Sequence, residues 1–260
     1  MNNLSKKALG IVGCGWLGRK LAARISDEFS ILASTRSDAS AHELSSMGYS
    51  SKAIEFSDEK DMPLDCWEVV PSLDVLIVLV PFSIRRATPQ SLALKMNNLC
   101  RFIGDYNGQL FFASSTGVYP KISRTFTEND LPVEENATEN QIKRSYPKAN
   151  ILRLAGLMGD NRLLHKYKVS NLKDPVNHVH YEDVCSVIIQ MIKHQWHYKL
   201  YNVVAPLHPT KEQVIASQLN KLVPTSPKTI DGRIISSAKL VSELGFVFKY
   251  PDPNLFHIQG

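Results

Sequence analysis

Three glycines stand close to the N-terminus with the spacing G-x-G-x-x-G, at Gly13, Gly15 and Gly18. In this spacing the first glycine permits a tight turn out of a strand, the second lets the backbone approach a pyrophosphate, and the third lets the next helix pack against the sheet. The first backbone N–H groups of that helix, at Trp16 and Leu17, would then face the anion. The chemistry that these residues predict is dinucleotide binding.

The segments on either side of the glycines support this interpretation. Residues 8–12 are a short apolar run typical of a strand, and Leu17, Leu21 and Ile25 share one face of the helix that follows. A glycine turn that serves only for packing is the alternative. Because a strand precedes the motif and an amphipathic helix follows it, we favour dinucleotide binding.

The end of the second predicted strand, residues 29–34, bears on the choice of cofactor. It continues into Thr35, Arg36 and Ser37, with no acidic residue before Asp38. An acid near this position binds the ribose hydroxyls of NAD, whereas an arginine accommodates the 2′-phosphate of NADP. We therefore expect NADP(H), with NAD(H) as the second candidate. In the alternative interpretation Arg36 is a solvated surface charge, and Thr35 and Ser37 cap a helix starting near Ser40.

Composition limits the class of protein. The chain has 260 residues, of which 43% are hydrophobic and 21% charged, enough for one large α/β domain with a smaller appendage. Its four cysteines are scattered without a C-x-x-C pair, which argues against a zinc site and suggests the cytoplasm. A net charge of +5 from dispersed residues argues against nucleic acid as a partner, and no apolar run of about 20 residues predicts a membrane span.

Strand and helix patterns alternate along much of the chain, which predicts a Rossmann-type doubly wound parallel sheet, an α/β fold. We expect further strands at residues 52–56, 74–80, 109–114, 150–154 and 201–204, and helices at residues 39–47, 89–106, 133–143, 182–194, 211–222 and 236–244. The predicted dinucleotide-binding domain comprises residues 1–156 and receives roughly 176–204. Residues 157–175 and 205–260 would form a small substrate-binding lobe.

The fourth of these strands runs into Val80, Pro81 and Phe82. Ligands of open α/β sheets bind at the carboxyl ends of the strands, so we expect Val80 and Pro81 at the cofactor and Phe82 at the substrate. A proline that ends the strand beside a core phenylalanine is the alternative.

Several segments resemble the extended short-chain dehydrogenase/reductase family of NAD-dependent epimerases and dehydratases. They are Ser114-Ser115-Thr116-Gly117-Val118-Tyr119-Pro120, residues 151–159, residues 177–184, residues 201–204 and residues 243–252. Their order and spacing cover essentially the whole chain. The glycine turn is one residue shorter than the G-x-x-G-x-x-G of typical extended members, which indicates an atypical relative.

The resemblance implies roles for individual residues. Ser115 matches the serine that hydrogen-bonds the reacting oxygen of the substrate, and Tyr119 matches a tyrosine that lines the pocket; these are the candidate catalytic residues. Ser114 would contact the cofactor, and Thr116, Asn161 and Arg162 the substrate. The structural alternatives are a packed Tyr119 ring and a surface Arg162.

The usual acid/base pair of that family, a tyrosine followed four residues later by a lysine, is missing. None of the nine tyrosines has a lysine at that position. Spacing places Glu135 and Glu139 near the vacated positions, so either is a candidate general acid or base, although exposed helix glutamates are usually solvated.

Three side chains suggest a metal site by type alone, namely His178, His180 and Asp183. We interpret His180 as a packed or pocket-wall residue and Asp183 as a charge near a helix terminus, and we expect no metal. The sequence thus predicts an NADP(H)-binding epimerase/dehydratase-like oxidoreductase acting on a small molecule, either nucleotide-sugar-like or a carbonyl compound. The alternative is a non-catalytic NADP(H) sensor or partner protein. A homodimer is compatible with either.

Overall fold

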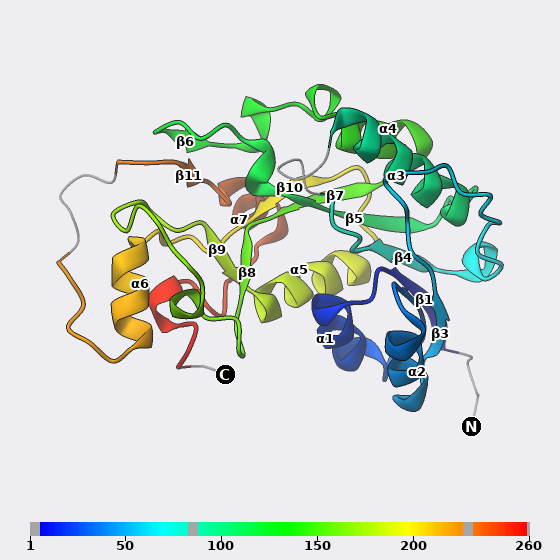
Figure 1. Ribbon diagram of the computed structural model, residues 1–260, viewed down its shortest axis with the longest axis horizontal. Helices are drawn as coiled ribbons and strands as arrows, with labels where there is room; N and C mark the ends of the chain where they lie inside the picture. Colours follow the sequence, from blue (N-terminus) through cyan, green and yellow to red (C-terminus); the bar gives the residue numbers. More distant parts are fainter. Residues whose placement is uncertain (1–5, 83–87, 226–230, 259–260) are drawn as a thin grey trace. The chain divides into compact units, whose positions relative to one another are not determined.

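The computed structural model describes residues 6–82, 88–225 and 231–258. In this part of the chain a seven-stranded, mostly parallel sheet has the strand order β10-β7-β5-β4-β1-β2-β3, which confirms the expected α/β doubly wound fold (Figure 1). Its strands are β1 (Lys7–Val12), β2 (Phe29–Thr35), β3 (Ser50–Ala53), β4 (Val75–Val78), β5 (Gln109–Ser115), β7 (Asn150–Leu154) and β10 (Leu200–Val203).

The register of the strands places the carboxyl ends of β1, β2, β4 and β5 next to one another. Val12, the last residue of β1, pairs with Ser34 of β2 and with Val78 of β4. Val78 in turn pairs with Phe112 of β5. The carboxyl ends of four parallel strands therefore meet at one edge of the sheet, where open α/β folds bind ligands.

Two pairs of helices cover the strands β1 to β5. Figure 1 shows α1 (Trp16–Ile25) and α2 (Asp38–Ser46) on one face and α3 (Pro89–Ile103) and α4 (Ala137–Ser145) on the other. Between α3 and the sheet lies a core of fully buried side chains that includes Val12, Val78 and Phe112. Strands buried in this way have near-continuous apolar sequences, which explains why they are recognisable from sequence.

The chain divides into two compact units. One comprises residues 1–114, 133–151 and 189–199, and the other comprises residues 115–132, 152–188 and 200–260. The expected domain division near residue 156 differs from these bounds. Long-range contacts explain the difference: the carboxylate of Glu128 accepts a hydrogen bond of 2.7 Å from the backbone N–H of Asn202, which ties residues 115–132 to β10.

Among its described residues, the second unit contains two small parallel pairs of strands and three α-helices. The strands are β6 (Thr125–Phe126) with β11 (Ile234–Ile235), and β8 (Gly156–Met158) with β9 (His178–His180). The helices are α5 (Tyr181–Lys193), whose last five residues belong to the first unit, α6 (Lys211–Gln218) and α7 (Ala238–Leu244). Strands of two or three residues are too short to give a periodic pattern, so β6, β8 and β11 were not predicted.

Several element boundaries differ from the prediction. The helix expected at residues 133–143 is α4, which begins only at Ala137, after the short 3₁₀ turn Val133–Glu135. Two other differences have clear local reasons. Strand β3 lies at Ser50–Ala53 rather than at residues 52–56, because its pairing with β2 ends where Thr35 meets Ala53. Helix α2 begins at Asp38 because the hydroxyl of Ser37 caps it by accepting a hydrogen bond from the backbone of Ser40. Among the helices of the described residues, none is both long and apolar enough to cross a bilayer.

Candidate functional site

The glycine turn between β1 and α1 has the backbone that its sequence predicts. Gly13 has a φ of +80°, which favours glycine. A Cβ at this position would lie 3.0 Å from both Cγ2 and the backbone nitrogen of Val80. The Gly13 N–H donates to the carbonyl oxygen of Ser34 at 3.1 Å. Gly13 is therefore required for the turn and for its close approach to the chain after β4.

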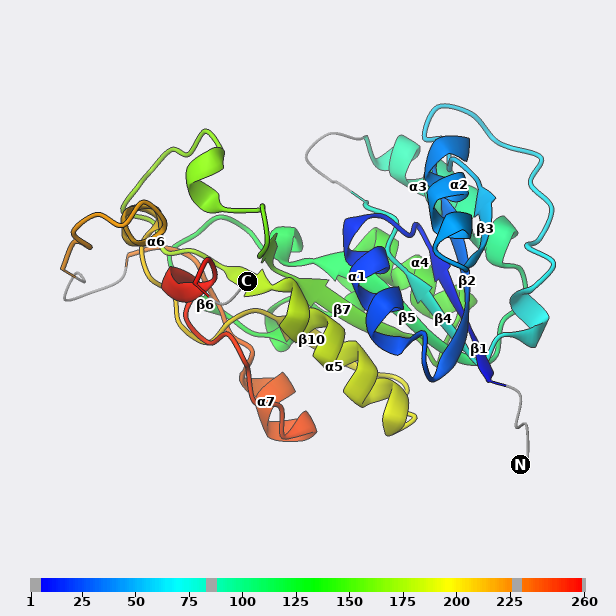
Figure 2. The ribbon, with the colours of Figure 1, turned by 90° about the horizontal axis from the view of Figure 1, so that it is seen from below.

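Gly15 and Gly18 meet different surroundings. A Cβ at Gly15 would meet nothing within 4 Å, whereas one at Gly18 would lie 3.1 Å from Cys14 Sγ and 3.2 Å from Ile11 Cγ2. Figure 2 shows the chain leaving β1 and returning through α1 along the sheet. The first turn of α1 has no acidic residue, and its N-cap Gly15 supplies no capping side chain. This helix start is thus open and suited to an anion.

The three polar residues at and after the end of β2, Thr35, Arg36 and Ser37, have different surroundings in the structure. Ser37 caps α2, as the structural alternative proposed, and Thr35 is buried. Arg36 is exposed and forms no ion pair with any described residue. Its guanidinium is therefore available to an anionic ligand at this edge of the sheet.

The chain after β4 also lies at the carboxyl edge. Val80 is buried, Pro81 is exposed and Phe82 is half-buried. The ring of Phe82 packs against Phe112 with centroids 5.7 Å apart. Lys95 Nζ donates to the carbonyl oxygen of Pro81 at 3.1 Å. Phe82 thus packs against the core, as in the alternative of a proline that ends the strand beside a core phenylalanine. Pro81 remains exposed at the strand end.

The end of β5 carries a serine and a buried carboxylate in contact. The hydroxyl of Ser114 donates to Glu139 Oε1 at 2.5 Å. The side chain of Asn136 caps α4 by accepting from the backbone N–H of Glu139 at 3.0 Å, and Glu139 is fully buried. Glu135, the other glutamate that spacing suggested, is exposed. The structure therefore separates the two candidates, and the premise that both are solvated does not hold for Glu139.

Ser115 and Thr116 begin the connection that follows β5. Ser115 is exposed, and its hydroxyl oxygen accepts a hydrogen bond from the N–H of Gly117 at 3.0 Å, which caps the short 3₁₀ turn Thr116–Val118. Because it is exposed, the Ser115 hydroxyl can still donate its hydrogen to a ligand. The side chain of Thr116 is buried, with 5% exposure.

Tyr119 lies in a buried hydrogen-bond network. Its hydroxyl donates to Asn202 Oδ1 at 2.8 Å and accepts from Arg153 Nη1 at 2.8 Å. Arg153 is fully buried and also donates to the carbonyl oxygen of Leu131 at 2.7 Å. Burial raises the pKa of the Tyr119 phenol, and the Arg153 guanidinium offsets this only in part. A packed Tyr119 with its hydroxyl on neighbours was the structural alternative, and the geometry matches it.

Arg153 was missed as a partner of Tyr119. A signal for it exists, because an arginine in the middle of the apolar run 151–154 must be buried together with polar partners. The partner itself is 34 residues away in sequence, so no local pattern points to it.

Asn161 and Arg162 belong to a tight turn. Gly159 and Arg162 exchange backbone hydrogen bonds of 3.2 and 3.0 Å, and Asp160 has a φ of +49°. Asn161 is exposed at the tip and Arg162 is half-buried. These two residues stay predictions as substrate contacts.

His180 and Asp183 are engaged in packing and backbone contacts. The ring of His180 lies 3.7 Å, centroid to centroid, from that of Tyr250. The Asp183 carboxylate accepts from the backbone N–H groups of Lys249 and Tyr250 at 2.8 and 3.0 Å. Within the described ranges, no group of three or more His, Cys, Asp and Glu side chains is placed to hold a metal ion.

The chain was compared with known proteins by sequence and by structure. No family model matches the chain. It is 27% identical to Protein YeeZ of Escherichia coli strain K12 over 270 residues, covering 95% of this chain and 97% of that protein. Among solved structures, dTDP-glucose 4,6-dehydratase of Bacillus anthracis in complex with NAD superposes with a TM-score of 0.70 at 14% identity, covering 97% of this chain and 96% of that one.

A human epimerase family protein solved with NADPH superposes with a TM-score of 0.66 at 11% identity, covering 95% of this chain and 97% of that one. These likenesses, at 14% and 11% identity, establish the fold alone: the chain has the Rossmann-type fold that these solved proteins also have. The resemblance noted in the sequence is confirmed at this level.

Proposed function

We propose that this chain binds a nicotinamide dinucleotide, preferably NADP(H), and acts as an epimerase/dehydratase-like oxidoreductase on a small molecule. The observation that carries the proposal is the glycine turn, where Gly13 is held in a left-handed conformation against Val80 and Gly15 faces open space. An open glycine at a helix start is what the approach of a pyrophosphate needs. The NAD and NADPH found in two proteins of the same fold support this assignment.

Different residues at the carboxyl edge of the sheet would bind different parts of the cofactor. The backbone at Gly15, Trp16 and Leu17 would hold the pyrophosphate. Arg36, with Thr35 and Ser37, would face the adenosine end, where a guanidinium favours a 2′-phosphate. Val80, Pro81 and Ser114 would line the nicotinamide end. When bound, the nicotinamide supplies or accepts a hydride.

Ser114 and Glu139 are the residues best placed to move a proton at this edge. The carboxylate of Glu139 already accepts the hydrogen of the Ser114 hydroxyl, so it can act as a base towards that oxygen. The exposed Ser115 would donate a hydrogen bond to the reacting oxygen of the substrate. Of the substrate contacts expected from the sequence, Phe82, Asn161 and Arg162 stay proposals, whereas the burial of Thr116 argues against a contact there.

A carbonyl compound or nucleotide-sugar-like molecule is the proposed substrate class, and the cytoplasm is the proposed location. The second candidate function is a non-catalytic NADP(H) sensor or partner protein. Two observations favour it: the tyrosine–lysine pair is missing from the sequence, and the Tyr119 hydroxyl is committed to Arg153 and Asn202.

Calorimetry with NADPH and NADH tests the binding proposal. We expect wild-type protein to bind NADPH more tightly, and Arg36→Ala to weaken NADPH about tenfold or more while leaving NADH unchanged, because a hydrogen bond to a charged group contributes about 1.5–3 kcal/mol. The control is Arg144→Ala, which removes another exposed arginine. Equal losses for both cofactors would exclude a role of Arg36 at the 2′-phosphate.

NADPH oxidation in the presence of a panel of carbonyl compounds and nucleoside-diphosphate keto-sugars then separates the two functions. An enzyme should turn over at least one of them, and Glu139→Gln should abolish that turnover while leaving NADPH affinity intact. Tight NADPH binding without turnover across the panel would favour the sensor.

A further inference from the structure

A lysine side chain lies at the carboxyl edge of the sheet, where β4 ends. Lys95 belongs to α3, and its Nζ donates to the carbonyl oxygen of Pro81 at 3.1 Å. The same Nζ lies 5.5 Å from the centroid of the Phe82 ring, a distance typical of a cation–π contact. Lys95 is half-buried. Since Pro81 is one of the residues that would line the nicotinamide end, this ammonium group lies at the part of the proposed cofactor site where the chemistry would take place.

Lys95 and the Ser114–Glu139 pair lie on the same face of the sheet. The ring of Phe82, next to Lys95, packs against Phe112 of β5 with centroids 5.7 Å apart. Phe112 and Ser114 are two residues apart in β5, so their side chains point to the same face. Figure 1 shows α3 and α4, the helices of Lys95 and Glu139, together on one face. The ammonium group therefore lies beside β4, and the proton-accepting carboxylate lies beside the neighbouring strand β5.

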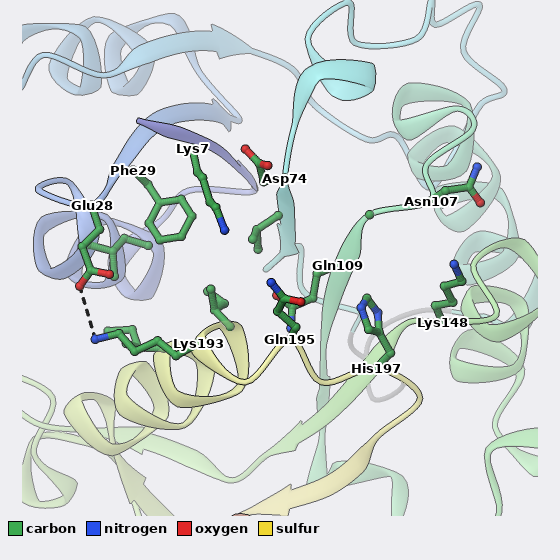
Figure 3. Close-up of a pocket in the computed structure, with 15 residues that line it drawn as sticks. Lys7, Glu28, Phe29, Asp74, Asn107, Gln109, Lys148, Lys193, Gln195 and His197 are labelled. Atoms are coloured by element: carbon green, nitrogen blue, oxygen red, sulfur yellow. Dashed lines mark ion pairs between the residues drawn. The ribbon is translucent and has the colours of Figure 1, made fainter. Parts of the chain in front are cut away.

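Lys95 forms no ion pair with any residue of the described ranges. Two other lysines of the same unit have partners elsewhere. Lys143 of α4 donates to the carbonyl oxygen of Ala149, next to the first residue of β7. Lys193 pairs with Glu28 at 3.4 Å beside the cavity at the amino ends of the strands, as Figure 3 shows. Lys95 therefore brings a positive charge to the carboxyl edge that a ligand there would meet.

The charge of Lys95 would distinguish the two redox forms of the cofactor. The oxidised nicotinamide ring carries a positive charge and the reduced ring is neutral, so an ammonium group close to the ring repels only the oxidised form. Two like charges about 8 Å apart, at an effective dielectric constant of about 30, change an affinity about tenfold. The carboxylate of Glu139 acts in the opposite sense. The contribution of Lys95 is therefore the change that its removal causes while Glu139 stays in place.

We propose that Lys95 is a cofactor-binding residue that disfavours the oxidised cofactor and so raises the preference of the site for NADPH over NADP⁺. The inference rests on the proposed dinucleotide site and adds to it a residue that selects the redox state. A site of this kind takes up the reduced form and releases the oxidised form readily. It therefore serves the reduction of a carbonyl compound, which gains a hydride from the cofactor and a proton from water and leaves as an alcohol.

Calorimetry with three ligands tests the proposal. NADPH and NADP⁺ differ in the charge of the ring, and adenosine 2′,5′-bisphosphate lacks the nicotinamide half. In Lys95→Met the ratio of the NADP⁺ dissociation constant to the NADPH dissociation constant should fall by a factor of about five to ten, while affinity for adenosine 2′,5′-bisphosphate stays within about twofold. Lys95→Arg keeps the charge, so it should keep the wild-type ratio within about twofold.

The control Lys193→Met removes the same charge at the amino ends of the strands and should keep the wild-type ratio. Thermal melting would verify that the variants fold. An unchanged ratio in Lys95→Met, or an equal change in Lys193→Met, would overturn the inference and leave the proposed function standing. A change in affinity for adenosine 2′,5′-bisphosphate as large as that for NADP⁺ would place the effect outside the nicotinamide end and overturn it too. If the wild type bound none of the three ligands, the proposed function itself would fail, and this inference with it.

Discussion

Gly15 and Gly18 are one helical turn apart, yet a side chain would meet open space at the first and packed atoms at the second. Gly15→Val should therefore change the free energy of unfolding by no more than about 1 kcal/mol. It should weaken NADPH more than tenfold, because the new side chain would enter the space proposed for the pyrophosphate. Calorimetry and denaturant unfolding measure the two quantities.

The matched variant Gly18→Val should lower the free energy of unfolding clearly, unlike Gly15→Val. Its side chain would crowd Cys14 and Ile11, and overpacking of this kind costs about 1–3 kcal/mol. If Gly15→Val bound NADPH like the wild type, the proposed role of the glycine turn would be wrong.

Tyr119 offers a second prediction at the scale of single residues. Tyr119→Phe removes the hydroxyl that joins Arg153 to Asn202 and leaves both buried groups short of a partner. We expect a loss of about 1–3 kcal/mol in the free energy of unfolding and no change in NADPH affinity. The control Tyr106→Phe also removes a buried hydroxyl, but its hydrogen bond to the Gln109 carbonyl oxygen is weak because it is 3.5 Å long. This control should therefore lose less free energy of unfolding. Unchanged stability in Tyr119→Phe would argue against the structural role.

At the scale of elements, the junction of β9 and α5 predicts sensitivity to acid. His180 is fully buried, and burial lowers its pKa from 6.5 to about 4. The unfolded chain therefore binds a proton between these values that the folded chain does not, so stability is retained above pH 6.5 and falls as the pH drops towards 4. Between pH 6.5 and pH 5 the loss should be about 1.5 kcal/mol from this histidine.

Thermal or denaturant unfolding across this pH range measures the effect. His180→Asn should reduce the slope of stability against pH, whereas the exposed His194→Asn should keep the wild-type slope. His178, whose pKa burial also lowers to about 4, adds to the same slope and remains in both variants. An unaltered slope in His180→Asn would show that His180 does not drive the acid sensitivity.

For the whole molecule, cofactor binding should appear as added stability. NADPH at a hundred times its dissociation constant should raise the free energy of unfolding by about 2.7 kcal/mol. For a chain of this size that corresponds to a rise in melting temperature of roughly 5–10 °C. Differential scanning fluorimetry should detect the rise in wild-type protein, whereas in Gly15→Val a tenfold weaker affinity limits the stabilisation at the same NADPH concentration to about 1.4 kcal/mol, or about half of the rise. A rise of equal size in both would place the cofactor elsewhere.

Local patterns in the sequence were enough to predict the glycine turn, the fold class, the long helices and the buried strands. Each depends on residues close together in the chain: the spacing of Gly13, Gly15 and Gly18, the apolar run of β4, and the amphipathic face of α1. Such signals hold because backbone conformation and the burial of a strand or helix face are determined within a few residues.

Tertiary structure decided which polar side chains meet. Ser114 and Glu139 are 25 residues apart, and Tyr119 and Asn202 are 83 apart. Their pairing follows from the register of the sheet and the packing of α4 and β10, which no local pattern specifies. By itself, then, the sequence determined the glycine turn and the Rossmann-type sheet. The fold decided that Glu139 is buried against Ser114 while Glu135 is exposed, because burial depends on what packs across the chain.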